Sequence, residues 1–313
     1  MAEKVDGREN RKKNRWRKWL PVYIMMLPGL TYLLINNYIP IFGLVTAFKK
    51  LDFQKGIWQS PWAGFSNFTY LFKTPDAFII TRNTLLYNVF FIALNICLSM
   101  IFAIFISDMK HRFCKKIYQS AVLLPYLMSI VIISYIVYAF LSPDKGMINN
   151  SILKPLGLDM VSWYMEPKYW PFILIIVNAW KGVGYNCLVF IAGLGGISPS
   201  YYEAAALDGA TKWQQIRYIT LPCMKKTVIT MVMLNIGRIF YSDFGLFYQI
   251  PLNSGALFDV TNTIDTYVYR SLLQFGNVGM ASAAGFYQSI IGFVFILACN
   301  FVVRKVDRDS ALF

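Results

Sequence analysis

The sequence is poor in the residues that most enzymes use for chemistry. A single histidine, His111, excludes a His-Glu-x-x-His zinc site and argues against a Ser-His-Asp triad. The five cysteines are odd in number and have no paired spacing, so neither a disulfide framework nor a zinc site is expected. No Gly-x-x-x-x-Gly-Lys-Ser/Thr loop is present to cradle nucleotide phosphates. We therefore predict no catalytic residue, no metal ligand and no cofactor site in this chain.

Charge is also scarce. Only 15% of the residues are charged and 57% are hydrophobic, whereas a soluble domain is about 25% charged. The scarcity is concentrated in apolar segments that reach the roughly 20 residues needed to span a bilayer. These segments lie at about 19–48, 83–107, 117–141, 170–194, 227–250 and 281–303. The sequence predicts an all-α integral membrane protein with six transmembrane helices in one domain (19–304), flanked by a basic N-terminal segment (1–18) and a short tail (305–313).

The net charge of +14 raises the possibility of nucleic-acid binding, but the distribution of the charge argues against it. With the N-terminus in the cytoplasm, the inner segments hold about twice as many lysines and arginines as the outer loops, as the positive-inside rule requires. This bias predicts that both termini are cytoplasmic. A basic N-terminus next to a span suits anionic lipid headgroups. We therefore expect a multi-pass protein that contacts membrane lipid and no nucleic acid.

Two features outside the apolar runs bear on packing. The outer loop between the first two spans is rich in aromatic residues, and its amphipathic composition predicts a segment at the outer membrane interface. These aromatic residues are Phe53, Trp58, Trp62, Phe65, Phe68, Tyr70 and Phe72. Glycines near the last two spans are predicted to permit close helix contacts. They are Gly237, Gly245, Gly279, Gly285 and Gly292.

The fourth and fifth predicted spans differ from the others because they contain charged residues. A Lys, Arg or Asp at mid-bilayer costs about 2.5–3.5 kcal/mol, so such residues usually face a bundle interior or a watery cavity. A continuous helix would place Asn235, Arg238 and either Tyr241 or Ser242 along one side. Amide, guanidinium and phenol groups suit a hydroxyl-rich or carboxylate-bearing ligand, although a polar clamp between helices is an equal alternative for any single residue. The candidate path residues are Asn178, Lys181, Asn235, Arg238, Tyr241 and Asp243.

A polar, helix-forming insert separates the fourth and fifth spans; residues 203–222 read EAAALDGATKWQQIRYITLP. Ser200 and Glu203 have the spacing of a capping box, and an alternative start uses Ser198 as N-cap and Pro199 as the first helical residue. Glu203 is then either a capping carboxylate, a contact for another protein, or both.

The rest of the insert predicts how this helix ends. We expect Gly209 to break it, a second short helix to cover 211–218, and Pro222 to stop that helix before the fifth span. Small residues around the break, such as Ala204 and Ala205, leave a surface that another protein can approach closely.

The spacing of this insert resembles the EAA loop of permease subunits of binding-protein-dependent ABC importers. Two further segments, GRIFYSDFGLFYQIP at 237–251 and TIDTYVYRSLLQFGNVGMASAAGFYQSIIGF from Thr263, look like the LplB-type branch of carbohydrate importer permeases. The similarity covers essentially the whole chain. One departure is Ile216, at a position that is often aromatic in relatives.

This resemblance implies a type I importer permease of the bacterial inner membrane rather than an enzyme. It implies a second homologous permease, two copies of a cytoplasmic ABC ATPase that holds ATP and Mg, and an extracellular solute-binding protein, lipoprotein or periplasmic, that delivers an oligosaccharide. The insert would form coupling helices seated in a cleft of the ATPase. ATP binding would move these helices, and their movement would rearrange the spans in an alternating-access mechanism. The implied ATPase-coupling residues are Glu203, Ala204, Ala205, Leu207, Asp208, Gly209 and Ala210.

Two alternatives stay open at this point. The same machinery could carry a peptide or an amino acid, which a ligand screen on the binding protein would reveal. A membrane enzyme or glycolipid flippase working alone is the more distant alternative, and it would not copurify with an ATPase.

Overall fold

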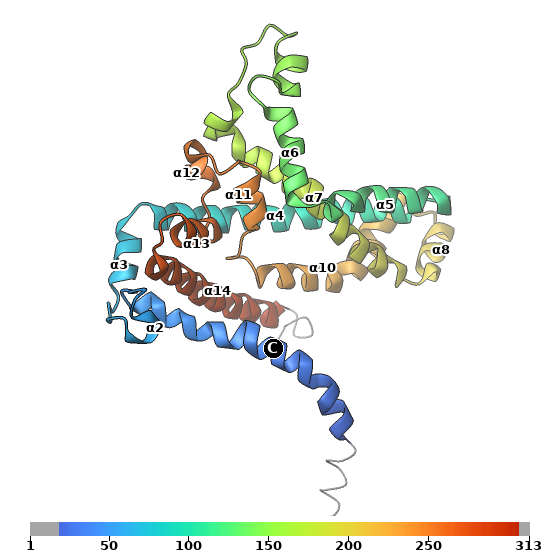
Figure 1. Ribbon diagram of the computed structural model, residues 1–313. Coiled ribbons are helices and arrows are strands. Elements are labelled where there is room, and N and C mark those ends of the chain that lie inside the picture. Colours follow the sequence, from blue (N-terminus) through green and yellow to red (C-terminus); the bar gives the residue numbers. More distant parts are fainter. Residues whose placement is uncertain (1–18, 307–313) are drawn as a thin grey trace, which may run out of the picture.

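The described part of the chain is helical throughout (Figure 1). The computed structural model describes residues 19–306, and among these there is no β-strand, only an isolated bridge between Lys49 and Trp62. Five helices are long and apolar enough to cross a membrane, and a bent pair of helices makes a sixth candidate. The all-α, six-span prediction is confirmed for these residues. The predicted segment 1–18 and the tail from 307 onward lie outside them.

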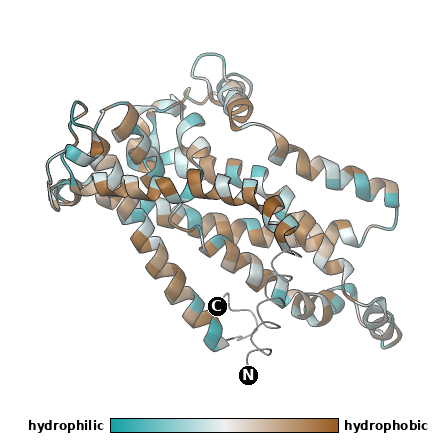
Figure 2. Cartoon of the chain, turned by 60° about the horizontal axis from the view of Figure 1, so that its bottom comes forward, coloured by the Kyte–Doolittle hydropathy of each residue, from teal (hydrophilic) through white to brown (hydrophobic). Residues whose placement is uncertain are grey.

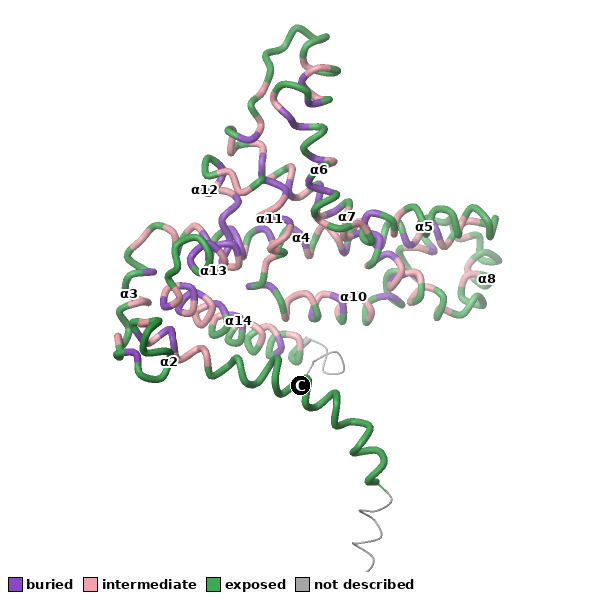
Figure 3. The backbone as a smooth tube through the Cα atoms, in the orientation of Figure 1, coloured by how far each residue is buried: buried purple, intermediate pink, exposed green. Residues whose placement is uncertain are grey.

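The first span is a helical rod that the rest of residues 19–306 leaves largely exposed. It runs Trp19–Phe48 and passes through a π-helical turn, η1 (Leu34–Tyr38), into a 3-10 helix, η2 (Ile39–Phe48). Pro40, at the second position of η2, lacks the N–H of a regular α-helix, which accounts for the change in winding there. The rod is exposed along most of its length and meets α14 near its end (Figure 3).

The second span is preceded by two short helices, α2 (Gly56–Gln59) and α3 (Ser66–Lys73). The span itself is α4 (Asp76–Ser107), whose 32 residues correspond to a length of about 48 Å. Apolar residues lie along the surface of the long helices as well as between them, as expected for a protein whose solvent is lipid (Figure 2).

The third predicted span is broken. Helix α5 (Arg112–Leu127) and helix α6 (Ile130–Leu141) meet at an angle of 95°. Ser129 is extended and its Oγ accepts a hydrogen bond from the Ile132 N–H, so α6 begins with its own cap. Pro125 in the last turn of α5 lacks an N–H for the helix. The segment predicted as the third span, 117–141, is therefore two helices joined at a sharp bend.

The remaining elements follow in chain order. A loop with η3 (Ile148–Leu153), η4 (Trp163–Met165) and η5 (Pro167–Tyr169) leads into the fourth span, α7 (Trp170–Gly195). Then come α8 (Pro199–Leu207), α9 (Lys212–Gln215), the π-helical η6 (Ile216–Thr220) and α10 (Leu221–Ile236). The described part of the chain ends with α11 (Phe244–Gln249), η7 (Gly255–Leu257), α12 (Phe258–Thr261), α13 (Ile264–Leu273) and the last span, α14 (Val278–Val306).

Helix α7 packs closely against both α4 and α5. Ser99 of α4 donates to the Val183 carbonyl of α7 at 3.0 Å, with both groups buried. A Cβ added to Gly184 would overlap the backbone carbonyl of Val122 in α5, so α5 and α7 approach at backbone distance. A Cβ at Gly182 would come within 3.1 Å of the Asn95 side chain. Small residues and short polar links therefore hold the seam.

A buried arginine fixes the segment that precedes the last span. Arg270 of α13 is 3% exposed, donates to Asn253 and Asn262, and lies 4.0 Å from the ring centre of Phe258. Burial lowers the pKa of Arg270 to about 10. Leu252 and Asn253 have positive φ, which is strained for leucine, and the Arg270–Asn253 bond holds this turn. The guanidinium thus serves as an internal clamp.

Candidate functional site

The helix α8 begins as the alternative sequence interpretation predicts. Ser198 is the extended N-cap residue and Pro199 occupies the first helical position. The Ser200–Glu203 capping box is absent, because Ser200 lies inside the helix and its Oγ is 2.8 Å from that of Ser198. Glu203 is exposed on the helix surface, so its carboxylate is available to another protein.

Gly209 ends α8 with a left-handed residue, as predicted. Its φ is +76°, its N–H donates to the Ala206 carbonyl at 3.1 Å, and the Ala210 N–H donates to the Ala205 carbonyl at 2.9 Å. These two bonds are those of a Schellman motif, which glycine favours because it carries no Cβ. A Cβ at Gly209 would meet nothing within 4 Å. Backbone conformation, rather than crowding, is therefore the reason for glycine here.

The surface of α8 is largely uncovered by the rest of residues 19–306. None of its residues is buried, and Leu207 is 90% exposed. Among the predicted coupling residues, Ala205 and Ala210 are half-buried and the others are exposed. The exposed ones are Glu203, Ala204, Leu207, Asp208 and Gly209. One hydrogen bond, between the Tyr202 and Thr220 hydroxyls at 2.9 Å, ties the helix to η6. The helix is thus anchored on one side and open on the other.

The second helix of the insert does not stop at Pro222. Thr211 and Gln214 form a capping box, and from Lys212 the helix continues without interruption to Ile236. The π-helical turn η6 lies just before Pro222. Pro222 has no N–H, so in a regular α-helix one carbonyl of the preceding turn would lose its hydrogen-bond donor, and the wider π-helical turn changes the pairing at this point. The predicted stop is wrong because a change in winding accommodates the proline.

An ion pair joins the start of α9 to the end of α4. Lys212 Nζ lies 2.6 Å from Asp108 Oδ1, and both side chains are largely exposed. Lys212 is the first residue of α9 and Asp108 is the C-cap of α4, so each charge sits at the unfavourable end of its own helix and faces the favourable end of the other. Because Lys212 and Asp108 lie far apart in the sequence, no local pattern predicts this contact between the insert and the second span.

On α7, the structure separates a clamp from an open polar cluster. Asn178 accepts a hydrogen bond from Asn95 of α4 at 2.8 Å, which favours the clamp interpretation for this residue. Lys181 Nζ lies 5.5 Å from the ring centre of Tyr126 in α5. Tyr126 in turn stacks on Tyr185 of α7, with ring centres 5.1 Å apart.

The two tyrosines were not among the predicted path residues. Tyr126 and Tyr185 are 41% and 49% exposed, so part of each side chain stays uncovered by the rest of residues 19–306. Tyr185 lies one helical turn after Lys181, which is a usable signal. Tyr126 is brought to them only by the packing of α5 on α7.

The other predicted path residues lie where the fifth span breaks, and not along one helix. Helix α10 ends at Ile236, with Gly237 as its C-cap. Asn235 donates back to the Met231 carbonyl, Arg238 and Tyr241 are exposed in the turn, and Asp243 caps α11 by accepting from the Leu246 N–H. The prediction of a continuous polar helix face is therefore wrong.

Side chains from three other elements satisfy the backbone of this break. Asn88 of α4 donates to the Ile239 and Tyr241 carbonyls at 2.9 and 3.2 Å. Asp265 of α13 accepts from both the N–H and the hydroxyl of Ser242, at 2.6 and 2.7 Å. Gln288 of α14 donates to the Phe240 carbonyl at 2.6 Å. Non-helical backbone at membrane depth is tolerated where protein satisfies it in this way.

The predicted glycine contacts are correct only in part. A Cβ at Gly245 would come within 2.8 Å of Ile130, and one at Gly279 within 2.9 Å of Asn67, so these two are close approaches. Gly285 meets nothing within 4 Å, Gly237 meets only carbonyls of its own helix, and Gly292 meets only an ordinary contact. The tighter approach at Gly184 of α7 and the one at Gly182, both described above, were missed. Within residues 19–306 no three His, Cys, Asp or Glu side chains gather where a metal could bind.

Comparison with known proteins gives a consistent result. The family model described as binding-protein-dependent transport system inner membrane component matches residues 95–308. The chain is 30% identical to Protein LplB of Bacillus subtilis over 94% of this chain and 91% of that protein. It is 28% identical to the polygalacturonan/rhamnogalacturonan transport system permease protein YteP of the same species, over 92% and 89% of the two chains.

A solved structure is similar over nearly its whole length. It is a chain of a bacterial ABC transporter involved in the import of the acidic polysaccharide alginate, with a TM-score of 0.86, 32% identity, and coverage of 95% of this chain and 99% of that one. A second structure of the alginate transporter, in complex with an alginate pentasaccharide-bound periplasmic protein, matches with a TM-score of 0.84 and 31% identity over 94% of this chain and 97% of that one.

Proposed function

Because this chain belongs to the family of binding-protein-dependent transport system inner membrane components, we propose that it forms the path by which an oligosaccharide crosses the membrane. As an ABC importer permease it is a transport subunit and not an enzyme. Its driving force then comes from ATP hydrolysis in separate subunits. The observation that carries the proposal for the cargo is the open cluster of Tyr126, Lys181 and Tyr185.

The chemistry of this cluster suits a sugar. Exposed tyrosine rings offer flat apolar faces for the C–H face of a pyranose, and their hydroxyls can bond to sugar hydroxyls. The names of relatives agree: one concerns polygalacturonan and rhamnogalacturonan, and two solved structures concern alginate. A peptide or amino-acid cargo has no comparable support.

Two cations favour a cargo that carries carboxylates. Lys181 is half-buried and Arg238 is exposed, and neither belongs to the three ion pairs found among residues 19–306. A cation in a partly desolvated position is available to a ligand anion. We therefore place Lys181, with Tyr126 and Tyr185, in contact with an acidic oligosaccharide, and Arg238 and Tyr241 elsewhere on the path.

The test of the cargo is substrate-selective transport in the assembled importer. Lys181→Met should weaken uptake of a uronate oligosaccharide by about 10-fold or more, the value of a charge-assisted hydrogen bond of roughly 1.5–3 kcal/mol, and should affect a neutral oligosaccharide much less. Lys168→Met, at an exposed lysine in η5, is the matched control. Equal losses for both sugars, with an unchanged unfolding temperature, would contradict carboxylate recognition.

The open face of α8 supports docking to a cytoplasmic ATPase. A nearly fully exposed leucine, Leu207, beside the small residues Ala204 and Gly209 gives an apolar knob on an approachable surface. The complete assembly that we propose holds a second permease, two ATPase subunits that bind ATP and Mg, and an extracellular binding protein. Both termini then lie on the cytoplasmic side, with α8.

Substitutions at two positions test docking. Leu207→Asp should abolish copurification of the ATPase or its stimulation by the loaded binding protein, whereas Leu207→Met should retain both.

Gly209→Val should leave the subunits assembled but lower transport, because a branched residue at positive φ costs roughly 1–2 kcal/mol and alters the exit of α8. Gly209→Asn, which tolerates this conformation, is the control. Normal transport in Gly209→Val and Leu207→Asp would rule out a coupling role for α8.

A further inference from the structure

A compact loop rich in aromatic residues lies at the end of the bundle opposite α8 (Figure 1). This aromatic loop, residues 49–75, connects the end of the first span at Phe48 to the start of α4 at Asp76. The far end of α4, at Asp108, bonds to Lys212 at the start of α9. The length of α4, about 48 Å, therefore separates the loop from the α8–α9 side.

Large aromatic side chains of this loop face outward. Phe53 is 76% exposed, Trp58 71%, Trp62 69% and Phe65 71%. A monomeric soluble protein rarely leaves so many large rings uncovered on one short segment. They require either a protein partner or lipid.

A buried lysine ties distant parts of the loop together by hydrogen bonds. Lys49 is 3% exposed, and its ammonium donates to the carbonyls of Ile57 and Trp58 at 3.0 and 2.7 Å. The same ammonium lies 5.0 Å from the ring centre of Trp62. Main-chain bonds from Lys50 to Pro61 and from Ala63 to Phe48 close the loop.

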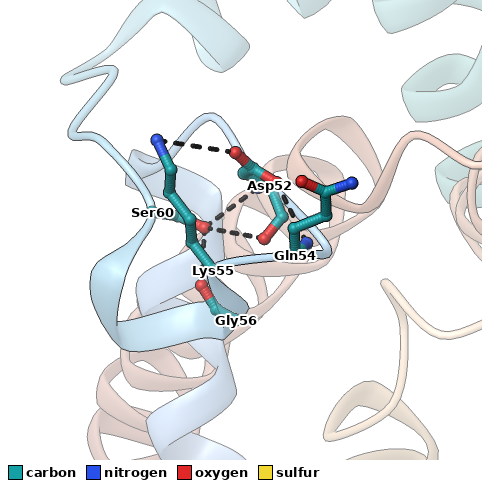
Figure 4. A network of polar contacts seen from close by, with 5 residues as sticks. All are labelled: Asp52, Gln54, Lys55, Gly56 and Ser60. Atoms are coloured by element: carbon teal, nitrogen blue, oxygen red, sulfur yellow. Dashed lines mark hydrogen bonds and ion pairs between the residues drawn. The ribbon is translucent and has the colours of Figure 1, made fainter.

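A second network satisfies the polar groups at the tip of the loop (Figure 4). The Ser60 hydroxyl donates to the Gly56 carbonyl at 2.6 Å and accepts from the Asp52 N–H at 2.9 Å. The Asp52 carboxylate accepts from the Gln54 N–H at 3.0 Å and pairs with Lys55 at 3.7 Å. These backbone groups and the Asp52 carboxylate are thus satisfied within the loop, which lowers the cost of moving its tip into a less polar medium.

The loop is also fixed to the ends of three spans. Leu71 of α3 is fully buried against residues of α4 and α14, including Ile80 and Ala284. The rings of Phe48, Phe65, Phe68 and Phe286 form one cluster with centres 5.2–5.9 Å apart. The loop therefore lies level with the helix ends, where the membrane surface must be.

We propose that the aromatic loop inserts Trp58, Trp62 and the neighbouring exposed rings into the phospholipid headgroup layer on the membrane face opposite α8. Lipid is the occupant we favour because the spans on both sides of the loop also carry exposed rings. Phe42 of the first span is 66% exposed and Phe78 of α4 is 70% exposed, and both belong to helices apolar enough to cross a membrane. Indole rings are enriched at this depth because they combine an apolar body with an N–H. The loop then sets the depth of α3 and of the span ends that pack on it.

The experiment uses the assembled importer in lipid nanodiscs and the fluorescence of its tryptophans. The difference between the protein and the Trp58→Phe/Trp62→Phe variant isolates these two indoles. Lipids brominated near the carbonyl end of the acyl chains should quench that difference at least about twofold, and more strongly than lipids brominated near the chain terminus. Trp213 of α9, 68% exposed, is the matched control: the contribution isolated with Trp213→Phe should be insensitive to both lipids.

Two results would overturn the proposal. The first is a Trp58/Trp62 contribution that aqueous acrylamide quenches and brominated lipid does not. The second is the same insensitivity to lipid together with protection from acrylamide when the binding protein is added, which would make the loop a protein-docking surface. No transport readout enters this test, so it is independent of the proposed cargo.

Discussion

The fourth and fifth spans look alike as apolar segments interrupted by charge, but they fold differently. Helix α7 continues through Lys181 and is 26 residues long, and the Lys181 ammonium lies 5.5 Å from the ring centre of Tyr126 in α5. The fifth span stops at Ile236, and the residues around Arg238 form a turn. A charge inside an apolar segment therefore does not decide whether the backbone continues.

The neighbours of each span explain the difference. Around α7, Gly184 lets α5 approach at backbone distance and Ser99 of α4 bonds to the Val183 carbonyl, and an unbroken helix fills the space between them. Around the fifth span, Asn88, Asp265 and Gln288 supply the hydrogen bonds that a broken helix loses. In both spans the backbone N–H and C=O groups have hydrogen-bond partners. In α7 the partners belong to the helix itself, and at the break in the fifth span they are side chains of other helices.

The largest expected effect tests the seam of α7. Gly184→Ala should lower the yield of folded permease and its unfolding temperature sharply, because the new Cβ overlaps the Val122 carbonyl and the backbones of α5 and α7 must separate. Overpacking of this kind costs about 1–3 kcal/mol or more. Gly195→Ala, in the same helix with nothing within 4 Å, should have little effect. Equal behaviour of the two variants would show that α7 is not held by backbone contact.

An intermediate effect is expected at the break in the fifth span. Asp265→Ala removes the acceptor of the Ser242 N–H and hydroxyl and should destabilise the permease by about 1–3 kcal/mol. Asp259→Ala removes an exposed carboxylate of α12 and is the control. Thermal unfolding in detergent measures both. If Asp265→Ala unfolds at the wild-type temperature, the break does not depend on outside partners, and the contrast with α7 disappears.

The smallest effect concerns the ion pair that leads into the fifth span. Asp108→Lys or Lys212→Asp alone should reduce coupled ATPase activity modestly, and the double exchange should restore most of it. The pair is exposed, so we expect an interaction of about 1 kcal/mol or less, weaker at high salt. Additive losses in the double variant would show that the contact between α4 and α9 does not matter.

Two of the differences between the predicted and the observed helix boundaries have the same physical origin. Pro222 and Pro125 both lie inside helices, the first next to a π-helical turn and the second before a capped break, and the proline alone does not indicate which. Ser200 and Glu203 have capping-box spacing, but Pro199 fits the first helical position better and places the cap at Ser198. Local patterns offered two solutions, and the surrounding helices selected one. Gly209, whose positive φ is a local requirement, was predicted correctly.

Composition and segment length were enough to predict that this protein lies in lipid, that it is helical and that it has six spans. Gly209, which needs a positive φ, was enough to predict where the exposed helix α8 ends. The bend after α5, the break after α10 and the contact of Tyr126 with Lys181 and Tyr185 could be seen only once the helices were packed together. Each of those depends on hydrogen bonds or close contacts between residues far apart in the chain, which no local pattern records.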